Sequence, residues 1–208
     1  MKRTFAIALG LLGWFALGLQ LWLSIRMSLD RGAGVANGVW MYLAFFTILT
    51  NLVVALTLTM PLLDARLERV FARPGVISAV AAYIVVVAAA YNLLLRGLWN
   101  PRGWQLLADI RLHDVIPGLY LIYWWMAVPR RSLHWRNLAA WCFYPIFYFV
   151  YAMARGALTG FYPYPFINVA RFGYAHVLAN ACGLLLGFLA VGAALITLNR
   201  VRRARGLC

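Results

Sequence analysis

The chain has 208 residues, of which 65% are hydrophobic and 12% are charged. A soluble globular domain is about 45–50% apolar and about 25% charged, so this composition excludes an ordinary soluble domain and indicates an integral membrane protein. The formal net charge of +14 would suggest nucleic-acid binding in a soluble chain. Here the arginines lie between apolar runs, where they anchor helix ends and set topology, so no nucleic-acid partner is expected.

The first apolar run follows "MKRT" and covers residues 5–25. It begins like a signal peptide, but it is too long for the apolar region of one, and no small-x-small cleavage pattern precedes a polar sequence. We therefore expect a retained first spanning helix that also directs insertion.

Six segments approach the roughly 20 mostly apolar residues that a spanning helix needs. They are residues 5–25, 39–62, 75–95, 112–128, 138–155 and 174–198. The connections are short and rich in Arg, Gly and Pro, without a long linker or a convincing internal repeat. The sequence predicts an all-α fold, with residues 1–208 forming a single polytopic bundle of six transmembrane helices.

The basic residues predict the orientation of this bundle. Twelve of the nineteen lie in the tails and even-numbered connections: Lys2, Arg3, Arg66, Arg69, Arg73, Arg130, Arg131, Arg136, Arg200, Arg202, Arg203 and Arg205. Seven lie in the odd-numbered connections: Arg26, Arg31, Arg96, Arg102, Arg111, Arg155 and Arg171. Because Lys and Arg are enriched in cytoplasmic loops, both termini are expected to be cytoplasmic.

The second predicted span contains the polar motif "FFTILTN". In a helix its Thr47, Thr50 and Asn51 share one face, because they are spaced i, i+3 and i+4. Trp40 and Ala44 are expected to extend that face. If the helix enters from the outer side, Thr47 lies about 12 Å below its outer end, at about 1.5 Å per residue.

Polar side chains at a similar depth occur in four other predicted spans. The fourth span opens with "RLHDVIPGLY", which is expected to place His113 and Asp114 in its first turn. The remaining candidates are Asn92, Tyr148, Arg155, His176 and Asn180. Polar groups inside a membrane face the bundle interior or a wet cavity. We therefore expect one cavity in the outer half of the bundle, with His176 buried and neutral.

Each candidate also has a structural interpretation. A membrane-helix Thr such as Thr47 commonly bonds a carbonyl of its own helix, and Asn51 and Asn180 suit interhelical hydrogen bonding. His113 is either a general base near neutral pH or an interfacial histidine. Arg155 either extends its guanidinium to lipid headgroups or holds the anionic group of a ligand.

Soluble-enzyme motifs are absent from the sequence, which contains no GxSxG, HExxH or P-loop pattern. Of the five acidic residues, only Asp109 and Asp114 lie near a histidine, so carboxylate-pair or carboxylate–metal chemistry is not expected. Three cysteines (Cys142, Cys182 and Cys208) without a CxxC spacing indicate neither a disulfide framework nor a metal site. We expect no metal and no organic cofactor.

Three motifs, "FFTILTN", "LHDVIPGLY" and "YPYPF", resemble the androgen-induced-gene membrane family, which includes the androgen-dependent regulator of tissue-factor-pathway inhibitor. The resemblance implies a six-span threonine hydrolase acting on fatty acid esters of hydroxy fatty acids. The short chain resembles the bacterial branch, which implies a multi-pass protein of a bacterial inner (cytoplasmic) membrane. By motif, Thr47 matches the nucleophile and His113 the histidine, with Thr50 and His176 as the alternatives. The proline follows His113 by four residues, where the eukaryotic pattern has five.

The implied chemistry is compatible with these residues. A threonine hydroxyl needs a base such as His113 to take its proton. Asp114 points about 100° away from His113 on an ideal helix, so the imidazole is expected to be oriented by Asp109, by Asn180 or by a backbone carbonyl. Oxyanion donors are expected from Asn51, Asn92 or a tyrosine hydroxyl.

The expected partner is a membrane lipid or a lipid ester whose free carboxylate is held by Arg155 or Arg171. Two alternatives remain. A non-catalytic lipid- or solute-binding or transport protein would use the same cavity, and a transporter would have broken helices at mid-membrane. A structural subunit would use the polar groups only to join helices.

Overall fold

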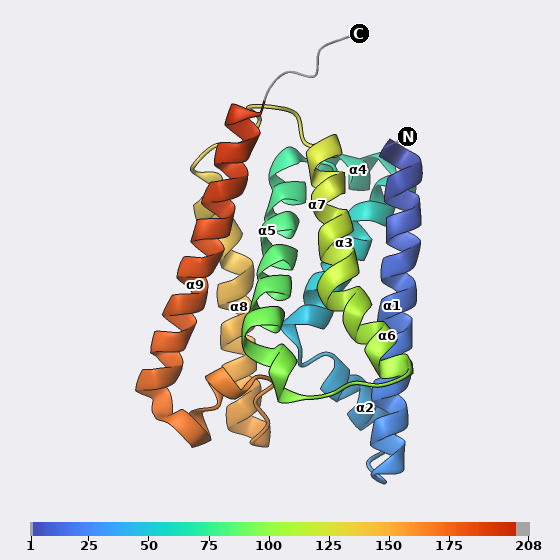
Figure 1. Ribbon diagram of the computed structural model, residues 1–208, viewed down its shortest axis with the longest axis vertical. Coiled ribbons are helices and arrows are strands. Elements are labelled where there is room, and N and C mark those ends of the chain that lie inside the picture. The colour runs from blue at the N-terminus through green and yellow to red at the C-terminus, as the bar shows by residue number, and fades with distance from the viewer. Residues whose placement is uncertain (1, 203–208) are drawn as a thin grey trace. The chain divides into compact units, whose positions relative to one another are not determined.

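The computed structural model describes residues 2–202, and every regular element among them is helical (Figure 1). The chain divides into two compact units, unit 1 (Met1–Ser132) and unit 2 (Leu133–Cys208). Four helical segments are long and apolar enough to cross a membrane: Lys2–Asp30, Pro74–Leu98, Asn137–Thr159 and Val169–Val201. The predicted all-α fold and the multi-pass membrane character are confirmed at this level.

In unit 1 the main packed helices are α1, α3, α5 and α7, joined by shorter elements. Its elements are α1 (Lys2–Asp30), α2 (Gly34–Tyr42), α3 (Phe46–Thr59), η1 (Met60–Leu62), α4 (Ala65–Phe71), α5 (Pro74–Ala90), η2 (Tyr91–Leu95), η3 (Arg96–Leu98), α6 (Trp104–Ile110), η4 (Arg111–Val115) and α7 (Ile116–Ala127). The core lies where α3 packs against α1 and α5, and where α7 packs against α1 and α5. Small side chains there, including the fully buried Ala16, Ala55 and Ala81, allow the helix backbones to approach closely.

The basic residues of unit 1 separate toward its two ends. The beginning of α1, the short helix α4 and the end of α7 lie at the same end of the unit (Figure 1). Lys2 and Arg3 begin α1, Arg66 and Arg69 lie in α4, and Arg130 follows α7. This grouping agrees with the distribution of basic residues from which the orientation was predicted.

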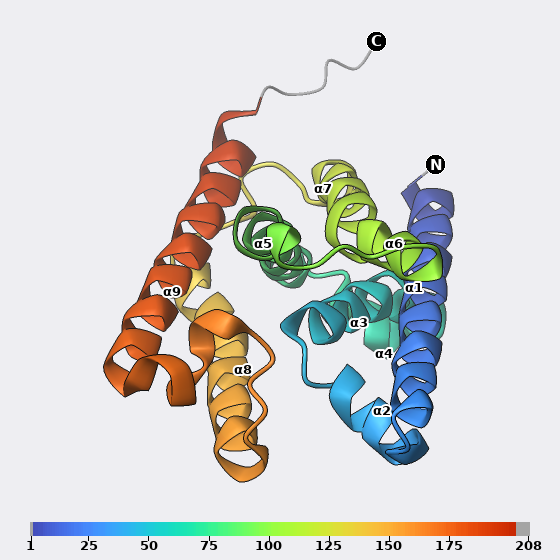
Figure 2. The same ribbon diagram turned by 60° about the horizontal axis from the view of Figure 1, so that its bottom comes forward.

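The second predicted span is not one helix, and the prediction for residues 39–62 was wrong in this respect. Helix α2 ends at Tyr42, Phe45 is extended (φ −92°, ψ 131°), and α3 begins at Phe46. The two helices are bent by 77° (Figure 2). Trp40 and Ala44 therefore do not extend the α3 face that carries Thr47.

Contacts with α1 hold α2 in its bent position. Gly38 packs so closely on α1 that an added Cβ would lie 2.6 Å from the Ile25 Cα. The Ser24 hydroxyl donates to the Gly38 carbonyl at 2.8 Å, and the Tyr42 hydroxyl donates to the Leu17 carbonyl at 3.1 Å. These two hydrogen bonds join consecutive helices through residues 14 and 25 positions apart, so an apolar run does not reveal them.

The fourth predicted span begins earlier than residue 112. Helices α6 and α7 are continuous through the π-helical turn η4, in which the Ile116 N–H bonds the Arg111 carbonyl. Pro117 has no N–H with which to continue the regular α-helical hydrogen bonds, and a π-turn is one way to pass that gap. His113 therefore lies within a π-turn in the middle of a helix, and not in a first turn.

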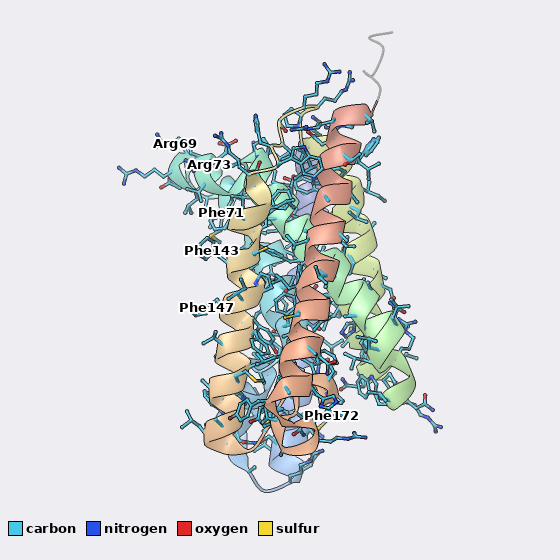
Figure 3. The ribbon with its side chains drawn as sticks, turned by 90° about the vertical axis from the view of Figure 1, so that its left-hand side faces the viewer. Arg69, Phe71, Arg73, Phe143, Phe147 and Phe172 are labelled. Atoms are coloured by element: carbon cyan, nitrogen blue, oxygen red, sulfur yellow. The ribbon has the colours of Figure 1, made fainter. Side chains whose placement is uncertain are left out.

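Unit 2 consists of α8 (Asn137–Thr159), the short helix η5 (Pro165–Ile167) and α9 (Val169–Val201). Helices α8 and α9 pack closely at Gly192, where an added Cβ would lie 2.6 Å from a Leu138 methyl carbon. The α9 backbone is bent at Gly173 (φ 71°), so its regular part begins where the sixth span was predicted to begin. Phe143 and Phe147 point away from α8 and are 76% and 75% exposed (Figure 3), as is typical of side chains that face lipid.

A buried hydrogen bond between α5 and α7 gives a first test of the packing of unit 1. The Trp124 indole donates to the Ser78 hydroxyl at 2.8 Å. We expect Trp124→Phe to lower the free energy of unfolding by about 1 kcal/mol, which corresponds to a melting-temperature fall of roughly 2–4 °C. Trp125→Phe is the matched control, because the neighbouring indole is 43% exposed. Equal shifts for both variants, measured by thermal melting in detergent, would contradict this packing.

Candidate functional site

Two π-helical turns, η2 and η4, meet in unit 1 and bring together polar side chains from both. The rings of Tyr91 and His113 stack with their centroids 3.7 Å apart and their planes 16° apart. Beside them, the Asn92 amide donates to the Asp114 carboxylate at 2.9 Å. The Arg96 guanidinium forms an ion pair with the same carboxylate. π-Turns are frequent at functional sites. We call four side chains of the two turns, together with Asp109 of α6, the π-turn cluster (Tyr91, Asn92, Asp109, His113 and Asp114).

The contacts of His113 define which of its ring nitrogens can accept a proton. Its Nδ1 lies 2.9 Å from the Asp109 carbonyl oxygen and 3.3 Å from an Asp109 carboxylate oxygen. A backbone carbonyl only accepts hydrogen bonds, so we assign the ring proton to Nδ1. In the neutral imidazole the lone pair is then on Nε2, which is the form that a general base requires. Asp109 is one of the three groups expected to orient this ring.

The Asp109 residue beside the imidazole is 95% buried. The Tyr91 ring, which stacks on the imidazole, is held at its other end, because its hydroxyl accepts a hydrogen bond from the Trp99 indole at 3.0 Å. Sequence reasoning missed Tyr91, Trp99 and Arg96. Only Arg96 had a sequence signal, since it follows Asn92 by four residues and so shares its helix face.

One amide group connects the "FFTILTN" motif with the π-turn cluster. The Asn51 Nδ2 donates to the Thr47 carbonyl at 2.9 Å and to the Leu112 carbonyl at 3.2 Å. Leu112 directly precedes His113, so a single nitrogen bridges the backbone of the candidate nucleophile and the backbone beside the candidate base. Thr50 and Asn51 are fully buried, whereas Thr47 is partly accessible in the first turn of α3.

The expectation that Asn51 and Asn92 supply oxyanion donors does not agree with their contacts. A side-chain amide has two N–H donors. Both donors of Asn51 are used, as described above. Those of Asn92 are used on the Ala88 carbonyl and on Asp114, each at 2.9 Å. Both residues therefore act here by joining backbone and side-chain groups.

In unit 2, Arg155 and Tyr148 are buried on the same side of α8, with 3% and 8% of their surfaces exposed. The Arg155 guanidinium donates to the Tyr151 hydroxyl at 3.4 Å and lies 5.9 Å from the centre of the Phe161 ring. The Tyr148 ring lies beside those of Tyr151 and Tyr164. Arg155 therefore does not extend toward headgroups, which was one of its two interpretations.

His176 and Asn180 differ from expectation. The prediction that His176 is buried was wrong, because its side chain is exposed on α9. The inward face of α9 in unit 2 instead carries Val177 and Ile196, and hydropathy alone does not show which face packs. Asn180 is exposed as well, and its amide donates to the Phe166 carbonyl at 2.8 Å. It thus holds the α8–α9 connection to α9.

Metal-ligating residues do not gather within the part of the chain that the structure describes. No group of three His, Cys, Asp or Glu side chains there is placed to hold a metal ion. Cys142 and Cys182 are free thiols, and Cys208, like Arg203 and Arg205, lies outside the described residues.

The arrangement in unit 1 offers an oriented imidazole, and the arrangement in unit 2 offers a buried guanidinium. These two clusters and the three sequence motifs are the features of the described residues that bear on function. No known protein family, curated protein or solved structure matches the chain.

Proposed function

We propose that the chain is a membrane-embedded hydrolase that cleaves a lipid ester, of the fatty acid ester of hydroxy fatty acid type, with Thr47 as nucleophile and His113 as base. The observation that supports this most directly is the Asn51 bridge, because it holds the first turn of α3 beside the π-turn of His113. The likeness of the three motifs to the family of threonine hydrolases supports the same assignment and suggests the substrate class.

The proposed reaction proceeds in two steps. His113 Nε2 takes the proton of the Thr47 hydroxyl as its oxygen attacks the ester carbonyl carbon. The resulting imidazolium gives that proton to the departing alcohol, and an acyl-threonine remains. A water molecule, deprotonated by the same nitrogen, then attacks the acyl carbonyl carbon; the bond between that carbon and the Thr47 oxygen breaks, the fatty acid leaves, and the imidazolium returns its proton to the Thr47 oxygen. Asp109 keeps the ring oriented and stabilises its positive charge in both steps.

The break between α2 and α3 supports Thr47 over Thr50 as the nucleophile. Because α3 begins at Phe46, Thr47 is in its first turn, where the helix dipole is positive. A developing oxyanion next to Thr47 would be stabilised by that end of the helix. Thr50 lies one turn further and is fully buried, so an ester has less access to it.

The proposed topology has six spans with both termini in the cytoplasm of a bacterium, whose inner membrane would contain the protein. In addition to the four long segments, α2 with α3 would form a broken second span, and α6 with α7 would form the fourth. The grouping of basic residues at the end of unit 1 that contains the start of α1 and α4 supports this orientation. The bend of 77° is compatible with a broken span.

That same bend favours a second candidate function, a non-catalytic lipid- or solute-binding or transport protein. Transporters commonly bind their substrate where a spanning helix is interrupted, because the freed backbone groups and the helix dipole face the ligand. In that case Thr47 and Asn51 would contact a solute without reacting with it.

Covalent labelling separates these two functions. We expect a fluorophosphonate to label the purified wild-type protein, and peptide mapping to find the adduct on Thr47. Thr47→Ala should abolish labelling because it removes the attacking oxygen. Thr59→Ala is the matched control, since Thr59 is on the same helix and its hydroxyl bonds the Ala55 carbonyl at 2.8 Å.

The outcomes have distinct meanings. Labelling lost in Thr47→Ala and kept in Thr59→Ala, with both variants melting like the wild type, would support the hydrolase. An unlabelled wild type, in an experiment where a known serine hydrolase is labelled, would contradict the hydrolase and favour the binding or transport function. An adduct mapped to Thr50 would keep the hydrolase but move its nucleophile.

A further inference from the structure

The connection between α3 and α5 in unit 1 contains a short basic helix next to a membrane-crossing segment. Helix α4 ends two residues before α5, whose first residue also begins the segment Pro74–Leu98 that is long and apolar enough to cross a membrane. The ends of such a segment lie near the lipid headgroups, because the hydrocarbon core has a fixed thickness. Helix α4 is therefore within reach of the headgroups of one leaflet.

The exposed side chains of this connection combine positive charge with apolar surface. Arg66 and Arg69 are spaced i, i+3 and share one face of α4. The Arg73 Nε donates to the Arg69 carbonyl at 2.8 Å, which folds the Arg73 side chain back along the helix. All three arginines are exposed, and Leu63 and Val70 in the same segment are 71% and 47% exposed. Basic and apolar side chains in one short segment are typical of a helix that lies between headgroups and acyl chains.

The three arginines form no ion pair with a carboxylate of residues 2–202. Both ion pairs in that part of the chain involve side chains of the π-turn cluster. Asp64 instead caps α4 by accepting the Arg66 N–H at 2.6 Å, and Glu68 is exposed without pairing with any of these arginines. The guanidinium groups are therefore available to an anion from outside the chain.

The end of unit 1 that contains α4 has an excess of positive charge. Four more exposed basic residues lie there, at the start of α1 and after α7 (Figure 1): Lys2, Arg3, Arg130 and Arg131. With the three arginines these make seven cations, and with the two acidic residues Asp64 and Glu68 the excess is five charges. Such a surface is complementary to the negative phospholipids of a leaflet.

We propose that α4 binds the phosphate headgroups of anionic phospholipids through Arg66, Arg69 and Arg73. A planar guanidinium donates two parallel hydrogen bonds to a phosphate, and the exposed Leu63 and Val70 contact the first carbons of the acyl chains. The excess of charge favours an anionic lipid over a zwitterionic lipid that carries the same phosphate. This surface does not depend on the proposed hydrolysis, because none of its residues belongs to the π-turn cluster.

Lipid titration of the purified, delipidated full chain in a neutral detergent tests the proposal. The probes are phosphatidylglycerol, phosphatidylcholine and glycerol 1-phosphate, which is a phosphate without acyl chains. At about 100 times its Kd, phosphatidylglycerol should raise the melting temperature by roughly 5 °C or more. The other two probes should not raise it at the same concentration. An equal rise with phosphatidylcholine would show that the negative charge is not recognised, and an equal rise with glycerol 1-phosphate would show a site for soluble anions. Either result would overturn the proposal.

Two triple variants locate the binding surface. The variant with Arg66→Gln, Arg69→Gln and Arg73→Gln should bind phosphatidylglycerol roughly 100-fold more weakly, because each basic residue near an anionic headgroup surface contributes about fivefold. The matched control loses the same charge at the other end of unit 1 (Figure 1) through three exposed arginines: Arg26→Gln, Arg31→Gln and Arg102→Gln. It should keep the wild-type affinity. Equal weakening in both variants would show a response to net charge alone and would contradict binding at α4.

Salt provides a test that does not depend on purifying a variant. Raising NaCl from about 0.1 M to about 1 M shortens the Debye length from about 10 Å to about 3 Å. The affinity of the wild-type protein for phosphatidylglycerol should therefore fall by about tenfold or more, since exposed charges are screened. An unchanged affinity would show that apolar contacts hold the lipid, and the arginines of α4 would not be its binding site.

Discussion

Replacing His113 by alanine is expected to slow fluorophosphonate labelling of Thr47 by about two to four orders of magnitude, the usual contribution of a positioned general base. A threonine hydroxyl reacts slowly until a base removes its proton. The structure orients the His113 imidazole through the contacts of Nδ1 with Asp109, and the tautomer assigned above leaves Nε2 as the acceptor. The measurement is the pseudo-first-order rate of labelling by purified protein.

The other two histidines are the controls for this experiment. His134 lies in an exposed connection and His176 on an exposed face of α9, so alanine at either position should leave the labelling rate unchanged. If His176→Ala stopped labelling while His113→Ala did not, the base would be the alternative that the motifs allowed, and the π-turn cluster would have another role.

Replacing Gly38 by leucine is expected to have the largest effect on stability. The new Cβ would lie 2.6 Å from the Ile25 Cα and 3.1 Å from the Ile25 backbone nitrogen, and a backbone cannot rotate away as a side chain can. Overpacking of this kind costs about 1–3 kcal/mol and sometimes more. We therefore expect the melting temperature to fall by roughly 5–10 °C, and Thr47 labelling to fall with it as α2 moves away from α1.

A second glycine provides a control for the added bulk. Gly18 is exposed on α1, and an added Cβ there would contact nothing within 4 Å. Gly18→Leu should therefore melt close to the wild type. If both leucine variants lost the same stability, the loss would come from the larger side chain in general, and the proposed close packing of α2 on α1 would be wrong.

Apolar run length predicted several elements well because a spanning helix must satisfy its backbone hydrogen bonds internally over a fixed thickness. The runs at 5–25, 75–95, 138–155 and 174–198 each lie within or largely within one of the four long segments. The break at residues 43–45 was not predictable in this way. It contains no proline or glycine, and α2 beside it is held on α1 by side-chain contacts that run length does not encode.

The candidate site was predictable to a similar extent. His113 and Asp109 are four residues apart, so their contact could be expected from α-helical spacing. The contact is still made although His113 lies in the wider π-helical turn. Tyr91 could not be chosen from the sequence, because its importance comes from stacking on a ring of another helix. The burial of Arg155 was also beyond the sequence, since an arginine near a helix end more often reaches for water or headgroups.

The π-turns have a consequence for how this protein tolerates changes in length. A π-helical turn holds one residue more than the α-helical turn it replaces. Deleting one residue of Arg111–Val115 would therefore place Pro117 in an α-helical turn that lacks one hydrogen bond, while the packed faces of α6 and α7 stayed in phase with each other. The tyrosine–imidazole stack would be lost but the scaffold would remain. Within such a scaffold, a single-codon insertion or deletion is enough to create or remove the polar cluster.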